Sequence, residues 1–391
     1  MRLSELQLWS LRERFPLNEW ISQPLSRIPA RRTLPTSSAP PTPPPYEGET
    51  AKKERILLTL TRPASSALLP YFRPLTPEPV SFFSWHCGHD APNIIRNAIL
   101  SATSSILIHI FNLSSKNIIQ ALVFKSSQSV PTSIHYHHMP KEALQELSPT
   151  NIQLVPFQGS KRVLLHKKTL LIDHRLVITG TGNFTDISLQ SDVNLMVQIH
   201  NDDLCSLMER HQAGCVSVGQ QTVCYCPMNR KGCGNEGQIL KEIRKAKSSI
   251  QIGMYILTQK NVLAALHEAA TERAVLVTII IDPAAKKQTF QLLKSLRSKI
   301  SVREGTCSAL MHNKVCIIDH ETAILGSANW SRRGLNTNQE DLLIIKPLTE
   351  SQKEVLATWW NFLCDQSIVL TEEGAEKCLI KRDDKDLLEP S

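Results

Sequence analysis

Two segments of the chain combine histidine, lysine and aspartate at one spacing. The first set is His166, Lys168 and Asp173, and the second is His312, Lys314 and Asp319. An imidazole can attack phosphorus or move a proton, and an ammonium group beside it can bind a phosphate oxygen. The duplicated pattern therefore predicts chemistry at a phosphate group, carried by two histidines and two lysines.

The spacing within each set separates two roles. Side chains at positions i and i+2 of a strand share one face, so each histidine and its lysine are expected to project together. Asp173 and Asp319 lie at an odd offset from these residues, which on a continuous strand points them at the opposite face. We therefore expect the aspartates to have a mainly structural role at the end of the strand.

A second short motif, Gly-Ser/Thr-x-Asn, follows each set. Its glycines, Gly180 and Gly326, let the backbone come close to a ligand. Its polar side chains can donate hydrogen bonds to the non-bridging oxygens of a phosphate, and they are Thr181, Asn183, Ser327 and Asn329. Together with the lysines, these groups would neutralise the charge that develops at phosphorus.

The elements that must position these residues are themselves duplicated, with a constant offset (250 − 106 = 144) between the segments 106–110 and 250–254. In each copy a helical stretch leads into an alternating strand at these positions. A helix at 261–270 and a strand at 275–281 follow in the second copy, and a weaker strand at 132–136 in the first. The pattern predicts an α/β fold of two tandem repeats, each a mixed sheet flanked by helices, related by a pseudo-two-fold axis and sharing one cleft.

The paired motifs resemble the HKD motifs of the phospholipase D superfamily, and the resemblance covers roughly residues 80–370. It implies that two phospholipase D-like halves pool their motifs in one active site and cleave a phosphodiester through a covalent phosphohistidine. It also implies that no metal and no organic cofactor are needed. By the same resemblance His166 is the nucleophile and His312 the acid, although the pseudo-symmetry allows the reverse.

A nucleophilic histidine also needs a partner that holds its second ring nitrogen. The superfamily places an orienting acid after each motif. The candidates are Asp192, which follows His166 (192 − 166 = 26), and Glu340, which follows His312 at a similar interval (340 − 312 = 28).

Composition and charge limit the class of protein. The chain has 44 Lys and Arg against 36 Asp and Glu, a net charge of +8, which suits nucleic acid or an anionic membrane surface. The best apolar run, residues 274–281, is too short to span a membrane, and charges throughout residues 1–20 leave no clear signal peptide. A cytoplasmic or peripheral membrane location is expected, with the destination left open.

The ten cysteines are scattered through a chain too long to depend on disulfides, so we expect a reducing compartment. The spacing of Cys224, Cys226 and Cys233 departs from that of a zinc knuckle. We therefore expect these three to be ordinary strand and loop cysteines.

Proline marks the predicted domain boundaries. Because 14 of the 23 prolines fall at positions 1–80, residues 1–79 are predicted to be a disordered arm that begins with a short amphipathic segment. Residues 80–220 and 221–370 are the two predicted HKD domains, and 371–391 form a C-terminal tail. Since one chain carries both motifs, we expect a monomer that contains an intramolecular pseudo-dimer.

The motifs alone do not choose among phosphodiesters. The basic surplus and the amphipathic N-terminus favour a phospholipid at a membrane surface, hydrolysed to phosphatidic acid. The same surplus and the compact repeats keep a metal-independent DNA or RNA endonuclease as the alternative. A phosphatidyltransferase is less favoured because the N-terminal spanning helices of such enzymes are missing, and a non-catalytic phosphate-binding scaffold because both motifs keep every polar group.

Overall fold

The computed structural model describes residues 72–160, 162–228, 235–283, 289, 291–292, 300–307 and 309–370. Nearly all of the predicted arm, the predicted C-terminal tail and Cys233 lie outside the described residues.

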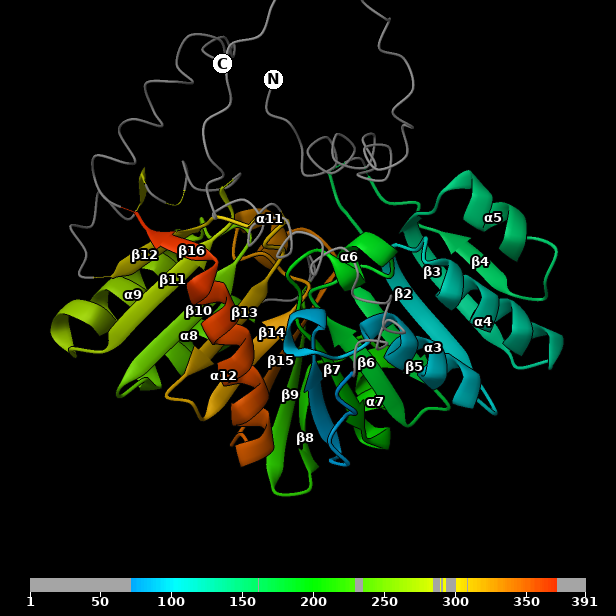
Figure 1. Cartoon of the computed structure of the whole chain (residues 1–391), viewed down its shortest axis with the longest axis horizontal. Coiled ribbons are helices and arrows are strands. Elements are labelled where there is room, and N and C mark those ends of the chain that lie inside the picture. Colours follow the sequence, from blue (N-terminus) through cyan, green and yellow to red (C-terminus); the bar gives the residue numbers. More distant parts are fainter. Residues whose placement is uncertain are drawn as a thin grey trace, which may run out of the picture. The chain divides into compact units, whose positions relative to one another are not determined.

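The chain forms two repeats of alternating strands and helices (Figure 1). The first contains β1 (Val80–Phe83), α3 (Ala91–Ser101), β2 (Ile106–Asn112), α4 (Lys116–Ser127), β3 (Thr132–His138), α5 (Lys141–Leu147), β4 (Gln153–Pro156), β5 (Lys168–Ile172), β6 (Leu176–Gly180), α6 (Asp186–Gln190), β7 (Met196–His200) and α7 (Asp202–Glu209). The second contains β8 (Gly214–Val218), β9 (Gln221–Met228), α8 (Asn235–Lys245), β10 (Ser249–Met254), α9 (Lys260–Glu272), β11 (Leu276–Ile281), β12 (Ser301–Gly305), β13 (Lys314–Ile318), β14 (Thr322–Gly326), α11 (Arg332–Asn336), β15 (Glu340–Lys346), α12 (Glu350–Asp365) and β16 (Ser367–Val369).

Each repeat is built on one mixed sheet, and the two sheets share a six-strand order. Over the described residues the first sheet runs β1-β7-β6-β5-β2-β3-β4 and the second β16-β12-β11-β10-β13-β14-β15-β9-β8. Thus β7-β6-β5-β2-β3-β4 corresponds to β15-β14-β13-β10-β11-β12. In both, β2 and β10 lie parallel to the next strand along the sheet and antiparallel to the motif strand. The predicted pair of mixed α/β repeats is therefore confirmed.

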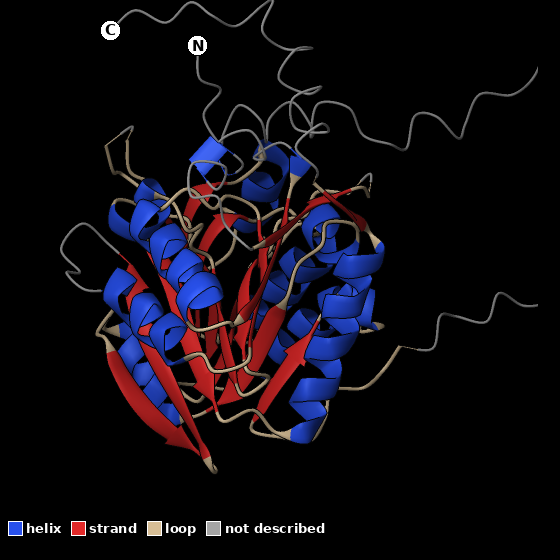
Figure 2. Ribbon diagram, turned by 90° about the vertical axis from the view of Figure 1, so that its left-hand side faces the viewer, coloured by secondary structure: helices blue, strands red, loops and turns tan. Residues whose placement is uncertain are grey.

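The apolar faces of the strands form three cores. One lies between the first sheet and helices α3, α4 and α5, and another between the second sheet and helices α8 and α9. The third combines residues of both sheets, such as Val177 and Val197 with Leu343 and Ile345, together with Trp359 of α12. The result is a helix, sheet, sheet, helix arrangement, and Figure 2 shows helices on both sides of the strands.

Local sequence explains the hairpins that follow the motif strands. Asp173 and His174, and likewise Asp319 and His320, have φ between +52° and +56°. Two consecutive left-handed residues form the tight turn that matches strand twist, and Asp and His tolerate this conformation better than most residues. The motif aspartate is thus the first turn residue of each hairpin.

Two expectations are corrected by the strands at the junction. Strand β8 belongs to the second sheet through its antiparallel pairing with β9, so the junction between the repeats lies between α7 and β8 rather than at residue 220. The same pairing brings Cys215 opposite Cys224, and the two form a disulfide. The expectation that the cysteines are reduced is therefore wrong for this pair.

Among the described helices, none combines the length and the apolar character that crossing a bilayer requires.

Candidate active site

His166 and His312, which lie in different repeats, face each other. Their ring centroids are 6.5 Å apart and the ring planes are 78° from parallel. Each ring is nearly buried, with 5% and 8% of the residue exposed. The backbone amide of His166 donates to the carbonyl of Gln339, which ties the first motif to the start of β15. Both imidazoles can therefore reach a single phosphate group.

The two motif lysines are buried beside these rings. Lys168 and Lys314 begin β5 and β13, and each Nζ donates to the carbonyl oxygen of its own histidine, at 2.6 and 2.8 Å. Two ammonium groups held in a dry site make a strong receptor for a phosphate anion.

Each lysine also lies over an aromatic ring that sequence reasoning missed. Lys168 Nζ is 5.3 Å from the ring centroid of Phe111, and Lys314 Nζ is 5.2 Å from that of Tyr255. The same rings contact His166 and His312, at centroid distances of 5.0 and 5.4 Å. Their positions differ by the repeat offset (255 − 111 = 144), so the duplication contained the signal that identifies them.

The motif aspartates are far from this chemistry. The carboxylate of Asp173 accepts hydrogen bonds from the backbone amides of Thr103, Ser104 and Ser105, just before β2. Asp319 accepts from the backbone amides of residues 247–249, at the start of β10. Burial raises the pKa of both carboxyls, but these hydrogen bonds outweigh it and lower the pKa below the usual range. Their role is to fix a hairpin to the neighbouring strand.

The orienting partners cross between the repeats. Nδ1 of His166 lies 2.8 Å from Oε2 of Glu340, and Nδ1 of His312 lies 3.3 Å from Oδ1 of Asn194. Asn194 is the counterpart of Glu340 by the offset that separates the histidines (340 − 194 = 312 − 166 = 146). The structure thus places Asn194 at the position for which the sequence suggested Asp192, and an amide stands where a carboxylate was expected.

The pKa values of Glu340 and His312 are shifted in opposite directions. Burial raises the pKa of Glu340 to about 8, against the opposing effect of Lys168. Burial, then Lys314, Lys168 and His166, lower the pKa of His312 well below its usual value. Burial and the neighbouring positive charges therefore favour the neutral form of His312 in this site.

The Gly-Ser/Thr-x-Asn motifs serve the orienting residues. The Thr181 hydroxyl donates to Asn194 Oδ1 at 2.7 Å and accepts from the amide of Leu195. The Ser327 hydroxyl accepts from the amide of Asp341 and hydrogen-bonds Glu340. The hydroxyl hydrogen of Thr181 is therefore committed to Asn194 and not, as the sequence suggested, to a phosphate.

The glycines and asparagines of this motif are equally enclosed. At Gly180 and Gly326 φ is +154° and +158°. A Cβ at Gly180 would meet the backbone at the start of β7, and a Cβ at Gly326 would meet the carbonyl oxygen of Asp341 on β15. These glycines are needed for close strand packing rather than ligand approach. Asn183 and Asn329 are buried, and within the described residues Asn183 Oδ1 has no hydrogen-bond partner.

A polar cluster in the central core lies directly behind the motifs. Lys167 Nζ is 2.8 Å from Asp341 Oδ1, and Asp341 also accepts from Tyr225 at 2.7 Å and from Thr169 at 2.5 Å. Lys167 lies between His166 and Lys168 at the start of β5, and Asp341 adjoins Glu340 on β15. We call Lys167, Thr169, Tyr225 and Asp341 the inter-sheet strut, because they link the segment that carries His166 to the strand that carries Glu340.

One side of the site continues into a row of rings. His137 stacks on Phe111 with centroids 5.2 Å apart and 16° between planes, and Phe157 lies 5.6 Å beyond it. Nearby, His138 Nδ1 is 3.2 Å from Asn112 Oδ1, and His135 lies against His109. The position equivalent to His137 in the second repeat is Ile281 (137 + 144), so the row of rings is one-sided.

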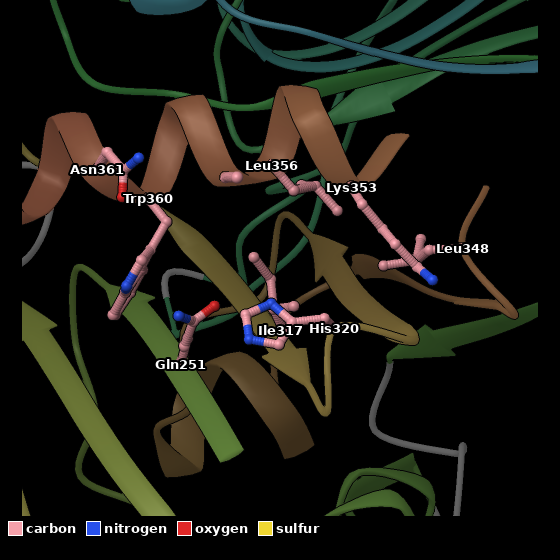
Figure 3. Close-up of a pocket in the computed structure, with 9 residues that line it drawn as sticks. Gln251, Ile317, His320, Leu348, Lys353, Leu356, Trp360 and Asn361 are labelled. Atoms are coloured by element: carbon pink, nitrogen blue, oxygen red, sulfur yellow. The ribbon is translucent and has the colours of Figure 1, made fainter. Parts of the chain in front are cut away.

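A small cavity of about 90 Å³ lies elsewhere, beneath α12. Figure 3 shows Trp360, Lys353 and Leu356 of the helix above Gln251, Ile317 and His320. None of the motif residues lines it.

In the described part of the chain, histidine, cysteine and acidic side chains form no group arranged to hold a metal ion.

Comparisons with known proteins agree with this geometry. The chain matches the family described as "Cardiolipin synthase, PLD-like domain" twice, over residues 95–214 and 239–359. A phospholipase D of Rickettsia conorii (strain ATCC VR-613 / Malish 7) is 33% identical over 147 residues, 37% of this chain and 70% of the relative. A mitochondrial cardiolipin hydrolase of Drosophila melanogaster is 29% identical over 153 residues, 33% of this chain and 59% of the relative. Both matches have about the length of one repeat.

Among solved structures, a phosphatidylserine synthase of Haemophilus influenzae Rd KW20 superposes with a TM-score of 0.62 at 13% identity. The match covers 79% of this chain and 94% of that chain. At this identity the likeness concerns the fold alone, and it extends over both repeats.

Proposed function

We propose, from the premise that this chain belongs to the phospholipase D superfamily, that it hydrolyses a phosphodiester through a phosphohistidine formed on His166. Relatives named phospholipase D and cardiolipin hydrolase support a phosphodiesterase of the hydrolase class. The observation that supports the finer mechanism is the meeting of two histidines and two lysines from different repeats in one buried site.

The roles follow from the partners of the two rings. When Glu340 is ionised, its carboxylate accepts a hydrogen bond from the Nδ1–H of His166, which leaves Nε2 with a lone pair for attack on phosphorus. As the N–P bond forms and the P–O bond breaks, His312 gives a proton from Nε2 to the leaving oxygen. His312 then takes a proton from water, whose oxygen attacks phosphorus and breaks the N–P bond. Lys168 and Lys314 stabilise the charge on the non-bridging oxygens throughout.

A burst assay with bis(p-nitrophenyl) phosphate tests these roles. Nitrophenolate is a good leaving group and needs no proton, so His312→Asn should release one equivalent per site and then stop as the phosphoenzyme. His166→Asn should release none, and neither variant should turn over. A burst in His166→Asn instead would exchange the two roles. Turnover in either variant at the wild-type rate would refute the shared two-histidine site.

For the substrate we propose the head-group ester of a phospholipid, cleaved at a membrane surface to give phosphatidic acid. The named relatives include a phospholipase D and a cardiolipin hydrolase, and the net charge of +8 favours an anionic surface.

A second candidate, hydrolysis of single-stranded nucleic acid, is favoured by the row of rings formed by Phe111, His137 and Phe157, because nucleobases stack on such rings. One preparation should be assayed for choline release from phosphatidylcholine vesicles and for cutting of labelled DNA and RNA. Choline release without cutting supports the lipid substrate. Cutting without choline release would replace it with nucleic acid.

A further inference from the structure

His312 and His166 are held by partners of different charge. The two contacts occupy equivalent places in the repeats, yet Glu340 presents to His166 a carboxyl group that can ionise, and Asn194 presents to His312 an amide that cannot. A carboxylate stabilises an imidazolium ion, whereas an amide oxygen only accepts a hydrogen bond. The two halves of the site therefore differ in how readily each ring can hold a second proton.

The Asn194 amide is locked in one orientation. Its Oδ1 accepts from the Thr181 hydroxyl at 2.7 Å, and its Nδ2 donates to the carbonyl of Ser188 at 2.8 Å. Because Oδ1 faces His312, the ring must donate from Nδ1, and Nε2 of the neutral ring carries the lone pair. Asn194 thus orients His312 without charging it.

The other groups that face His312 oppose its protonation. Lys314 lies on its own strand, Lys168 and His166 come from the opposite repeat, and burial adds to their effect on the His312 pKa. A hydrogen bond to the backbone of Thr181 acts in the other direction, and the Tyr255 ring is 5.4 Å away. Within the described residues, no carboxylate is among the groups that contact the His312 ring.

We propose that His312 receives its catalytic proton only when a phosphodiester anion lies between Lys168 and Lys314, so that the substrate supplies the negative charge that position 194 lacks. Asn194 is then a positioning residue that keeps the acid neutral until substrate binds. This proposal rests on the proposed function, since it assigns the acid role to His312.

The proton balance is closed within one cycle. Binding of the diester draws one proton from solvent to His312 Nε2, and the first step transfers it to the leaving oxygen as the N–P bond replaces the P–O bond. In the second step water loses a proton to the same nitrogen while its oxygen replaces His166 on phosphorus. Release of the product returns that proton to solvent.

Nuclear magnetic resonance of the full-length protein with isotope-labelled histidine tests the proposal directly. The His312 signal is identified by its loss in His312→Asn, and dimethyl phosphate serves as the diester probe at pH 7. We expect a neutral ring without the probe and a protonated ring at saturation. A ring that is already protonated without the probe, or one that stays neutral at every probe concentration, would overturn the proposal.

The variant Asn194→Asp provides the matched test, because it places a carboxylate at the equivalent of Glu340. Its His312 ring should be protonated with and without dimethyl phosphate. For an alkyl leaving group in phosphatidylcholine, kcat/KM of the wild type should fall about tenfold per pH unit on the alkaline side. In Asn194→Asp this fall should begin at higher pH. The burst rate with bis(p-nitrophenyl) phosphate should not shift in this way.

These measurements separate three outcomes. A purely structural role for Asn194 would lower both activities together and leave the alkaline limb in place, which would refute the proposal. If neither diester is cleaved but the ring is protonated on binding the probe, the proposed reaction fails while the coupling of anion and proton stands. If diesters are cleaved but the ring is protonated before binding, only the coupling fails.

Discussion

The carboxyl of Glu340 is placed where it serves His166 at a cost to stability. It is fully buried and hydrogen-bonded by Asn338 as well as by His166. Because burial raises its pKa from 4.5 to about 8, the folded protein binds more protons than the unfolded chain between these values. This tighter proton binding stabilises the folded state. The gain in the free energy of unfolding is complete below pH 4.5 and is lost as the pH rises through about 8.

Replacing this group should therefore separate activity from stability. Glu340→Gln keeps the shape but removes the ionisable carboxyl that holds the His166 tautomer, and kcat should fall roughly a hundred- to ten-thousand-fold. Above pH 8 the variant should unfold at a higher temperature than the wild type, because no buried carboxylate forms. Calorimetry at pH 6 and pH 9 checks this, and a Tm below that of the wild type at pH 9 would contradict it.

The two histidines and two lysines that meet in the site are predictable from the sequence, because the duplication repeats both residue types and their spacing. The orienting residue of the first repeat is not evident from residue type, because an acid is expected there and Asp192 is the nearby acid. The interval from His312 to Glu340, counted again from His166, leads to Asn194 (340 − 312 = 194 − 166). The crossing of partners between repeats depends on how two sheets pack, and no spacing within one motif encodes it.

At the scale of elements, the inter-sheet strut breaks the symmetry of the duplication. The counterparts of Lys167 and Asp341 are Asn313 and Leu195 (167 + 146 and 341 − 146), so the equivalent pair in the other half carries no charge. Burial raises the pKa of Asp341, but Lys167, Thr169 and Tyr225 outweigh it and lower that pKa. The stabilisation from Asp341 is thus present above its unfolded pKa of 3.8 and is lost as the pH falls further.

Removing one partner of the Lys167–Asp341 pair should lower the free energy of unfolding more than replacing both partners. Asp341→Leu leaves Lys167 buried without its carboxylate and should lower the free energy of unfolding by about 3–5 kcal/mol. The double variant Lys167→Asn, Asp341→Leu installs the residues of the other repeat and should recover part of this loss. Denaturant unfolding of the two single variants and the double variant gives the coupling. A cost for the double variant equal to the sum of the singles would show that the pair is not coupled.

The hairpin of β8 and β9 offers a second test at this scale. Its disulfide joins Cys215 and Cys224, nine residues apart, and closing such a short loop stabilises by about 2–3 kcal/mol through the unfolded chain. Reductant should lower the unfolding midpoint of the wild type but not that of Cys215→Ser, Cys224→Ser. Equal midpoints of the wild type with and without reductant would contradict this. The scattered cysteines did not predict the bond, because only the strand register brings these two together.

In the whole molecule, the internal duplication predicts the architecture better than the pattern of any single helix or strand does. Residues 106–110 and 250–254 marked the same strand in both copies, and the family matches at 95–214 and 239–359 follow that duplication. The differences between the copies were not predictable in this way. Strand β1 closes the edge of one sheet, whereas β9 and β8 occupy the corresponding edge of the other, and the shared central core depends on both.

The crossed partners make one chain sufficient for a complete site. His166 needs Glu340 and His312 needs Asn194, so neither half holds a full set, and the intact chain should act as a monomer. Mixing the inactive variants His166→Asn and His312→Asn should restore nothing, because every cleft would still lack one histidine. Mixing each variant with wild type controls for inhibition. Activity regained in the mixture would mean that repeats exchange between chains, so that the pseudo-two-fold site is completed by a second molecule.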